Sequence, residues 1–161
     1  MQLDTELARL GLSGDDAQAL FLVPAALVAW ADGYVDMKEL ETLASRHRPA
    51  DCQGAMVCLS DRGRQFLYHH FIYVKPDHET ITNTLRLVSA MLDLLPEDRA
   101  QRYREAIAAM CVDVARSSGS GLLSFFTKIS ADERAVIRQV AVILRLLDNA
   151  EIAQLLGGSG A

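Results

Sequence analysis

The strongest constraint on the fold is an apolar stretch from Ala17 to Ala31, in which Gln18 is the only hydrophilic side chain. A helix that is apolar on every side must be buried. Pro24 lies inside the stretch and lacks the amide hydrogen that an α-helix uses, so we expect a kink there. The cleanest run, Phe21 to Ala31, is about half of the roughly 20 residues that a membrane span requires. The sequence therefore predicts a buried central helix and no transmembrane segment.

Signals for the start and end of helices recur along the rest of the chain. Gly11 ends a short helix from Leu3 to Leu10, and Pro76 and Pro96 are each followed by acidic residues, as in a first helical turn. Short helices are also predicted at 51–59 and 148–156. The run QFLYHHFIYV at 65–74 has no clean period; a strand is conceivable there, but its helical neighbours favour a helix.

These patterns predict an all-α fold, a compact bundle of roughly seven to nine helices with short loops. The length of 161 residues fits one domain with a core, which we place at 1–156. The remaining residues, 157–161 (GGSGA), are expected to form a flexible tail.

Two segments of the chain resemble each other. Asp36-x-x-Glu39 and Ser130-x-x-Glu133 both have the form of a capping box, and an apolar residue precedes each. Both follow an apolar helix that ends in a turn. This similarity predicts an internal pseudo-twofold repeat of helix–loop–helix units. The two units span residues 15–47 and 97–147.

The turn after the central helix has part of the pattern of a calcium-binding EF-hand. If Gly33 is placed at the sixth position of that loop, Asp32 and Glu39 fall on the fifth and twelfth ligand positions. The first and third positions are then Val28 and Trp30, which cannot supply carboxylates. A complete EF-hand is excluded, and any metal here would need carboxylates from elsewhere in the chain.

Asp113 is the natural additional carboxylate, because it interrupts an apolar helix and a charge there needs a partner or a ligand. One hypothesis is a shared oxygen-rich site for a hard cation, Ca²⁺ or Mg²⁺, which Zn²⁺ fits less well. In the other, the acids only cap helices and turns, and Asp113 pairs with an arginine such as Arg116. The candidate metal ligands are Asp32, Asp36, Glu39, Asp113 and Glu133.

Charge and cysteine content narrow the function. The net charge is −5 and the basic residues are scattered, so no stripe for nucleic acid is formed. Three cysteines without a CxxC pair indicate reduced thiols, and the four histidines lack metal-ligand spacing. The chain has no nucleophile elbow or P-loop, and no signal peptide is apparent, so we expect a non-enzymatic cytoplasmic protein.

A Gly/Ser-flanked apolar segment, Leu122 to Phe126, allows two interpretations. If its leucines and phenylalanines are exposed, they would form a docking patch for a protein or a membrane surface. If they fold back over the core, they would anchor a long loop.

Ala31-Asp32-Gly33-x-Val35-x-x-x-Glu39, after an apolar helix, resembles the TerB-like tellurite-resistance family. The second half is similar too, with a glycine-rich loop from Ser118-Gly119 leading to Ile129-Ser130-x-x-Glu133. The resemblance implies an all-helical fold with an internal repeat, metal-binding acids at Asp32, Glu39 and Glu133, and no established enzymatic activity. It also implies membrane-embedded and cytosolic partners of a resistance system, hence a location in the cytoplasm or peripheral to the inner membrane through a partner.

The resemblance favours a metal-responsive or protein-binding module in tellurite or envelope stress. The first alternative is a purely structural interaction module without a metal. The second is an enzyme acting on tellurite through Cys52 or Cys58, although no neighbourhood that would lower a thiol pKa is visible. The oligomeric state is left open.

Overall fold

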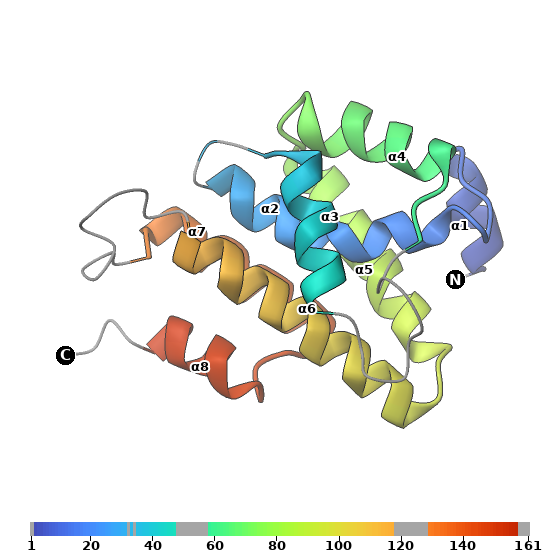
Figure 1. Ribbon diagram of the computed structural model, residues 1–161. Coiled ribbons are helices and arrows are strands. Elements are labelled where there is room, and N and C mark those ends of the chain that lie inside the picture. The colour runs from blue at the N-terminus through green and yellow to red at the C-terminus, as the bar shows by residue number, and fades with distance from the viewer. Residues whose placement is uncertain (1, 32, 34, 48–57, 118–128, 158–161) are drawn as a thin grey trace.

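The computed structural model describes residues 2–31, 33, 35–47, 58–117 and 129–157, and these form an all-α bundle without strands (Figure 1). The predicted fold class is confirmed. The helices are α1 (Leu3–Arg9), η1 (Ala17–Leu22), α2 (Val23–Ala31), α3 (Met37–Arg46), α4 (Asp61–Leu67), η2 (Tyr68–Ile72), α5 (His78–Asp93), α6 (Glu97–Ser117), α7 (Ala131–Leu144) and α8 (Ala150–Gly157). The predicted helix at 51–59 lies mostly outside the described residues, and the pseudo-twofold relation stays a prediction.

The apolar stretch 17–31 forms two helices of different type. A 3₁₀-helix, η1, runs to Leu22, and the amide of Val23, the first residue of α2, donates to the carbonyl of Leu20. The ring of Pro24 would clash with the carbonyl four residues earlier in a continuous α-helix. At the predicted kink, the chain therefore changes from a 3₁₀-helix to an α-helix.

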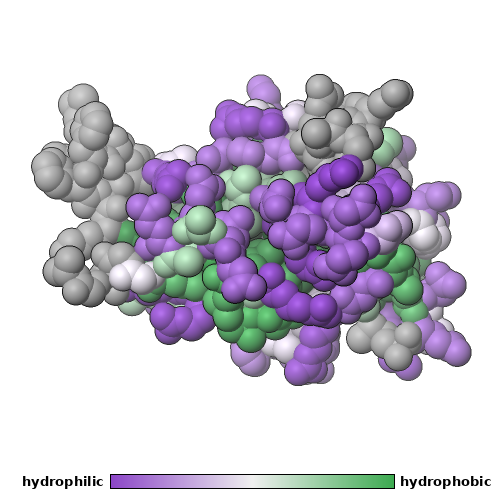
Figure 2. Space-filling view, turned by 90° about the horizontal axis from the view of Figure 1, so that it is seen from below, coloured by the Kyte–Doolittle hydropathy of each residue, from purple (hydrophilic) through white to green (hydrophobic). Residues whose placement is uncertain are grey.

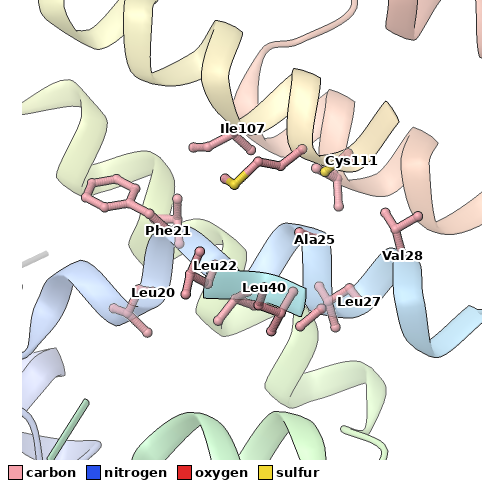
Figure 3. Close-up of a cluster of buried hydrophobic side chains, with 14 of the residues drawn as sticks. Leu20, Phe21, Leu22, Ala25, Leu27, Val28, Leu40, Ile107 and Cys111 are labelled. Carbon is pink, nitrogen blue, oxygen red and sulfur yellow. The ribbon is translucent and has the colours of Figure 1, made fainter. Parts of the chain in front are cut away.

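The helix α2 is the centre of the bundle. It contacts α6, α7 and α5, and η1 and η2 also pack against it. Figure 1 shows it crossing between α4 and the pair α6 and α7. Its residues Ala25, Ala26 and Val28 have no exposed surface, as predicted for a helix that is apolar all round. In Figure 3 its side chains point toward Leu40 of α3 and toward Ile107 and Cys111 of α6.

The segment at 65–74 is helical, which decides between the two interpretations of its sequence. The α-helix α4 continues into a π-helical turn, η2. Phe71 is fully buried there, and its carbonyl accepts a hydrogen bond of 2.6 Å from the indole Nε1 of Trp30. That bond satisfies a carbonyl at the end of a helix and holds η2 against α2.

A buried carboxylate holds the start of α4 against η1. Asp16 is 7% exposed and accepts hydrogen bonds from the amide and hydroxyl of Ser13, at 2.9 and 2.8 Å, and from the hydroxyl of Ser60 at 2.6 Å. These bonds, with that from Ser60 the largest, hold the pKa of Asp16 below its ordinary value. Ser60 also caps α4 by accepting from Gly63 at 3.0 Å. A Cβ at Gly63 would lie 3.0 Å from that of Ala19, so glycine allows this close approach.

The surface seen in Figure 2 is mostly hydrophilic, with a hydrophobic area near its centre. Within the described residues, no helix is both long enough and apolar enough to span a membrane.

Candidate functional site

The predicted acidic residues are used by the fold in three separate ways. The first is a helix cap: Asp36 accepts a hydrogen bond of 2.7 Å from the amide of Lys38 and starts α3. A capping box would use the amide of Glu39 instead, and the side chain of Glu39 would bond back. Glu39 is exposed, and the described cap of α3 is the bond from Lys38 and not one from Glu39, so the capping box predicted here is wrong. Gly33 has φ of 95°, which fits the predicted turn after α2.

The second use is an ion pair at the opposite end of α3. Nε2 of His47 lies 2.5 Å from Oδ2 of Asp113, and Nη1 of Arg46 lies 3.3 Å from the same oxygen. Asp113 thus pairs with an arginine, as one of the two hypotheses held, but Arg116, the example named there, instead lies 3.9 Å from Glu151 of α8. Burial raises the pKa of Asp113, but the hydrogen bond and charge of His47, followed by those of Arg46, outweigh it. The pKa of Asp113 is therefore lowered.

The ion pair of Asp113 predicts a stability that depends on pH. A carboxylate whose pKa is lowered on folding stabilises the protein above its unfolded pKa of about 4, and this contribution is lost as pH falls further. Asp113→Asn should cost about 1 kcal/mol at pH 7, since the carboxylate is only partly buried. In thermal melts from pH 7 to pH 3, the melting temperatures of the unmodified protein and of Asp113→Asn should converge. A melting difference that stays constant down to pH 3 would contradict this assignment.

The third use is the capping box at the start of α7, which is confirmed. The hydroxyl of Ser130 accepts from the amide of Glu133 at 3.1 Å, and the carboxylate of Glu133 accepts from the amide of Ser130 at 2.8 Å. Glu133 is 4% exposed, so this carboxylate is already engaged inside the protein.

The structure does not gather these acids into one ligand set. In the part of the chain that is described, no three His, Cys, Asp or Glu side chains lie together as a metal site would require. Asp36 and Glu39 lie at the first turn of α3 and the partners of Asp113 at its end, about 10 to 16 Å away along the helix axis. Asp32 lies outside the described residues, so its role stays a prediction.

A small pocket lies where α2 ends and α5 and α7 begin. We call it the junction pocket. Its volume is about 240 Å³, below the roughly 300–1,000 Å³ of small-molecule sites, so it suits a single large side chain. Apolar groups dominate the lining, with Lys75 and Asp132 as the charged members. The complete lining is Leu27, Trp30, Ala31, Lys75, Pro76, Ile81, Asp132, Ala135 and Val136.

Two exposed apolar residues directly precede two lining residues of the pocket in the sequence. Tyr73 is 69% exposed and Val74 is 60% exposed, directly before Lys75 and Pro76 of the pocket lining. The ring of Tyr73 stacks on that of Tyr68 with centroids 5.2 Å apart, which fixes its orientation. Exposed apolar side chains that precede the lining of an apolar pocket in the chain indicate an interaction surface. Sequence reasoning missed this surface, although the aromatic run at 65–74 was its signal.

The cysteines give no support for thiol chemistry within the described part of the chain. Cys111 is fully buried, and burial raises its pKa to about 12, so the reactive thiolate is not formed at neutral pH. Cys58 is exposed, and its amide donates to the side chain of Gln18 at 2.8 Å. Cys52 and the apolar segment from Leu122 to Phe126 lie outside the described residues.

Three comparisons with known proteins give no family assignment. No family model, no curated protein and no solved structure matches this chain.

Proposed function

We propose that this protein is a non-enzymatic helical module that binds a partner protein through the junction pocket. The observation that carries the proposal is the apolar pocket of about 240 Å³, whose lining residues Lys75 and Pro76 directly follow the exposed Tyr73 and Val74 in the chain. Its size suits one leucine, methionine or phenylalanine side chain of a partner. Lys75 and Asp132 at the pocket would pair with an acidic and a basic residue of that partner.

Three of the predicted metal ligands are bonded to protein groups, which favours an interaction module and not a metal site. Asp36 caps α3, Asp113 is paired with His47 and Arg46, and Glu133 is bonded to Ser130. A metal at these positions would have to break bonds that already stabilise the fold. This is the alternative in which the acids act as caps and ion pairs.

A variant whose side chain fills the junction pocket tests the proposed binding of a partner protein. Ala135 lines the pocket and is exposed, so Ala135→Trp should fill the hollow without loss of stability. Helical peptides selected from a displayed library against the unmodified protein should carry a large apolar residue flanked by charge. They should lose at least about tenfold in affinity for Ala135→Trp, because one well-packed anchor side chain carries at least that much binding energy.

Matched controls make this experiment decisive. Ala153→Trp changes an exposed alanine of α8 by the same amount and should leave peptide affinity unchanged. Lys75→Glu should shift the selected peptides from acidic to basic flanking residues. Peptides that bind equally well to the Ala135→Trp protein would overturn the proposal.

A second candidate function follows from the resemblance of Ala31-Asp32-Gly33 and Ile129-Ser130-x-x-Glu133 to the TerB-like family. In that case the module serves tellurite resistance or envelope stress in the cytoplasm, with membrane-embedded and cytosolic partners, and Asp32 contributes to a site for a divalent cation. Calorimetric titration with Ca²⁺, Mg²⁺ and Zn²⁺ tests the cation. The absence of binding heat, or binding that Asp32→Ala leaves unchanged, would contradict it.

A further inference from the structure

The N-terminal helix α1 is held to the bundle by few contacts. It has seven residues, and Leu7 is its only buried side chain, at 1% exposure. Leu3 and Leu10 are partly buried, and the remaining positions face solvent to varying degrees. Isolated helices shorter than about 12 residues are marginal in water, so α1 depends on its docking for its structure. One buried leucine offsets little of the entropy cost of ordering seven residues.

Unfilled space lies on both sides of α1. A pocket of about 460 Å³ is lined by Glu6, Arg9 and Leu10 at its C-terminal end and by α5, whose Arg86 and Leu87 form part of the wall. A second cavity of about 260 Å³ lies beside its first turn, against Phe21, Met91 and Tyr103. Leu87 and Met91 are four residues apart on α5 and share one face. The surface on which α1 docks, lined by α5, η1 and α6, therefore has unfilled pockets at both ends of the helix.

The chain after α1 can act as a hinge. Gly11 has φ of 73°, a conformation that favours glycine. Its amide donates to the carbonyl of Ala8 at 3.0 Å, and the amide of Leu12 donates to that of Leu7 at 2.9 Å, which is the Schellman pattern of a helix end. Leu12 is 5% exposed and anchors the chain beyond the hinge. Detachment of α1 would therefore leave the core behind Leu12 in place.

We infer that α1 is a detachable plug in a helix-binding groove formed by α5, η1 and α6, and that the groove accepts an amphipathic helix of a partner protein. The plug itself shows what the groove holds, because its leucines at positions 3, 7 and 10 follow the spacing of one helix face. Arg86 and Arg99 line the two pockets, whose carboxylates, Glu6 and Asp4, both belong to α1 and would leave with it. The favoured partner helix is therefore acidic, with leucine or larger apolar side chains that fill the cavities better than α1 does.

Hydrogen exchange of the unmodified chain gives the first test. Amides of α1 should exchange by local opening, at least about 100-fold faster than the buried amides around Ile107, and with little dependence on denaturant. Exchange of α1 only through global unfolding, with the same denaturant dependence as α6, would overturn the inference. No substitution is involved, so this result does not depend on a variant that fails to fold.

Competition by a peptide gives the second test. A synthetic peptide of residues 2–12 (QLDTELARLGL) should bind the full-length Leu7→Ala protein at least about 30-fold more tightly than the unmodified chain, whose own α1 competes better. Amide shifts in an NMR titration should fall on α5 and η1. The same peptide carrying Leu7→Ala should not bind, and Thr5→Ala, at an exposed position of α1, should behave like the unmodified chain. Equal affinity for the Leu7→Ala and unmodified proteins would contradict the plug.

The preference for an acidic partner is tested with charge variants. The peptide with Arg9→Glu also loses the ion pair of Arg9 with Glu6, so its affinity is compared between two proteins and not with the parent peptide. It should bind the Leu7→Ala protein about 2- to 5-fold more tightly than the Leu7→Ala/Arg86→Ala protein, because positions 9 and 86 line the same cavity. Equal affinity for the two proteins would overturn the assignment of the charge to this groove.

Discussion

Phe71→Ala is expected to lower the free energy of unfolding by about 3–5 kcal/mol, the cost of truncating a fully buried phenylalanine. Phe71 lies in the π-helical turn η2 and packs against Phe66, with ring centroids 5.7 Å apart. The cavity left behind would also loosen the segment whose carbonyl receives the indole hydrogen bond of Trp30. Because small domains have about 5–15 kcal/mol in total, this one change would remove much of the stability. Denaturation by urea, followed by circular dichroism, measures it.

Val74→Ala is the matched control, three residues further along the chain. Val74 is 60% exposed, so its truncation should change the unfolding free energy by no more than about 0.5 kcal/mol. The same control should weaken peptide binding at the junction pocket if Val74 contributes to that surface. A cost of less than about 1 kcal/mol for Phe71→Ala would show that this ring is not part of the core.

Asp93→Ala is expected to lower the free energy of unfolding by about 2–3 kcal/mol. Asp93 accepts from Arg104 at 3.3 Å and from Nη2 of Arg145 at 2.8 Å. Arg104 has a side chain only 7% exposed, and its Nε already lacks a hydrogen-bond partner. Removing Asp93 would leave this buried charge with Glu97 alone, at 3.9 Å and 93% exposed. A fully buried pair costs about 3–5 kcal/mol when broken, and the half-exposed Asp93 reduces that figure.

Substitution of the arginine instead of the aspartate should have a smaller effect on the free energy of unfolding, which makes the prediction specific. Arg104→Met removes the buried charge and keeps an apolar chain of similar length, so it should cost less than about 1 kcal/mol. The double variant Asp93→Ala/Arg104→Met should recover most of the loss caused by Asp93→Ala. If the two single costs simply add, the buried charge of Arg104 is not the cause.

Helix positions and fold class could be predicted because their signals are local. Apolar periodicity, prolines and caps act within about one helical turn, so the start of α7 at Ser130 and the break at Pro24 could be located from neighbouring residues alone. The wrong prediction of a capping box at Asp36 also concerns a distance of less than one helical turn. The carboxylate of Asp36 accepts from the amide of Lys38 and not from that of Glu39. The two amides are one residue apart, and the sequence pattern does not distinguish between them.

The partners of the acids could not be predicted in the same way. Asp113 was expected to meet either a metal or Arg116, three residues away on the same helix. It pairs with His47 and Arg46, which are more than sixty residues earlier in the chain. Which distant residue meets a charge depends on how α3 docks on α6, and that docking is set by the whole apolar face of both helices.

The sequence by itself determined that this protein is a helical bundle built around the buried apolar stretch 17–31, because burial pattern and capping are properties of short segments. Only the tertiary structure decided which surfaces are available. The junction pocket takes its lining from α2, α5 and α7, and the groove under α1 takes its walls from α5, η1 and α6. These residues come together through the sum of many small packing contacts between distant segments, and no local pattern encodes that sum.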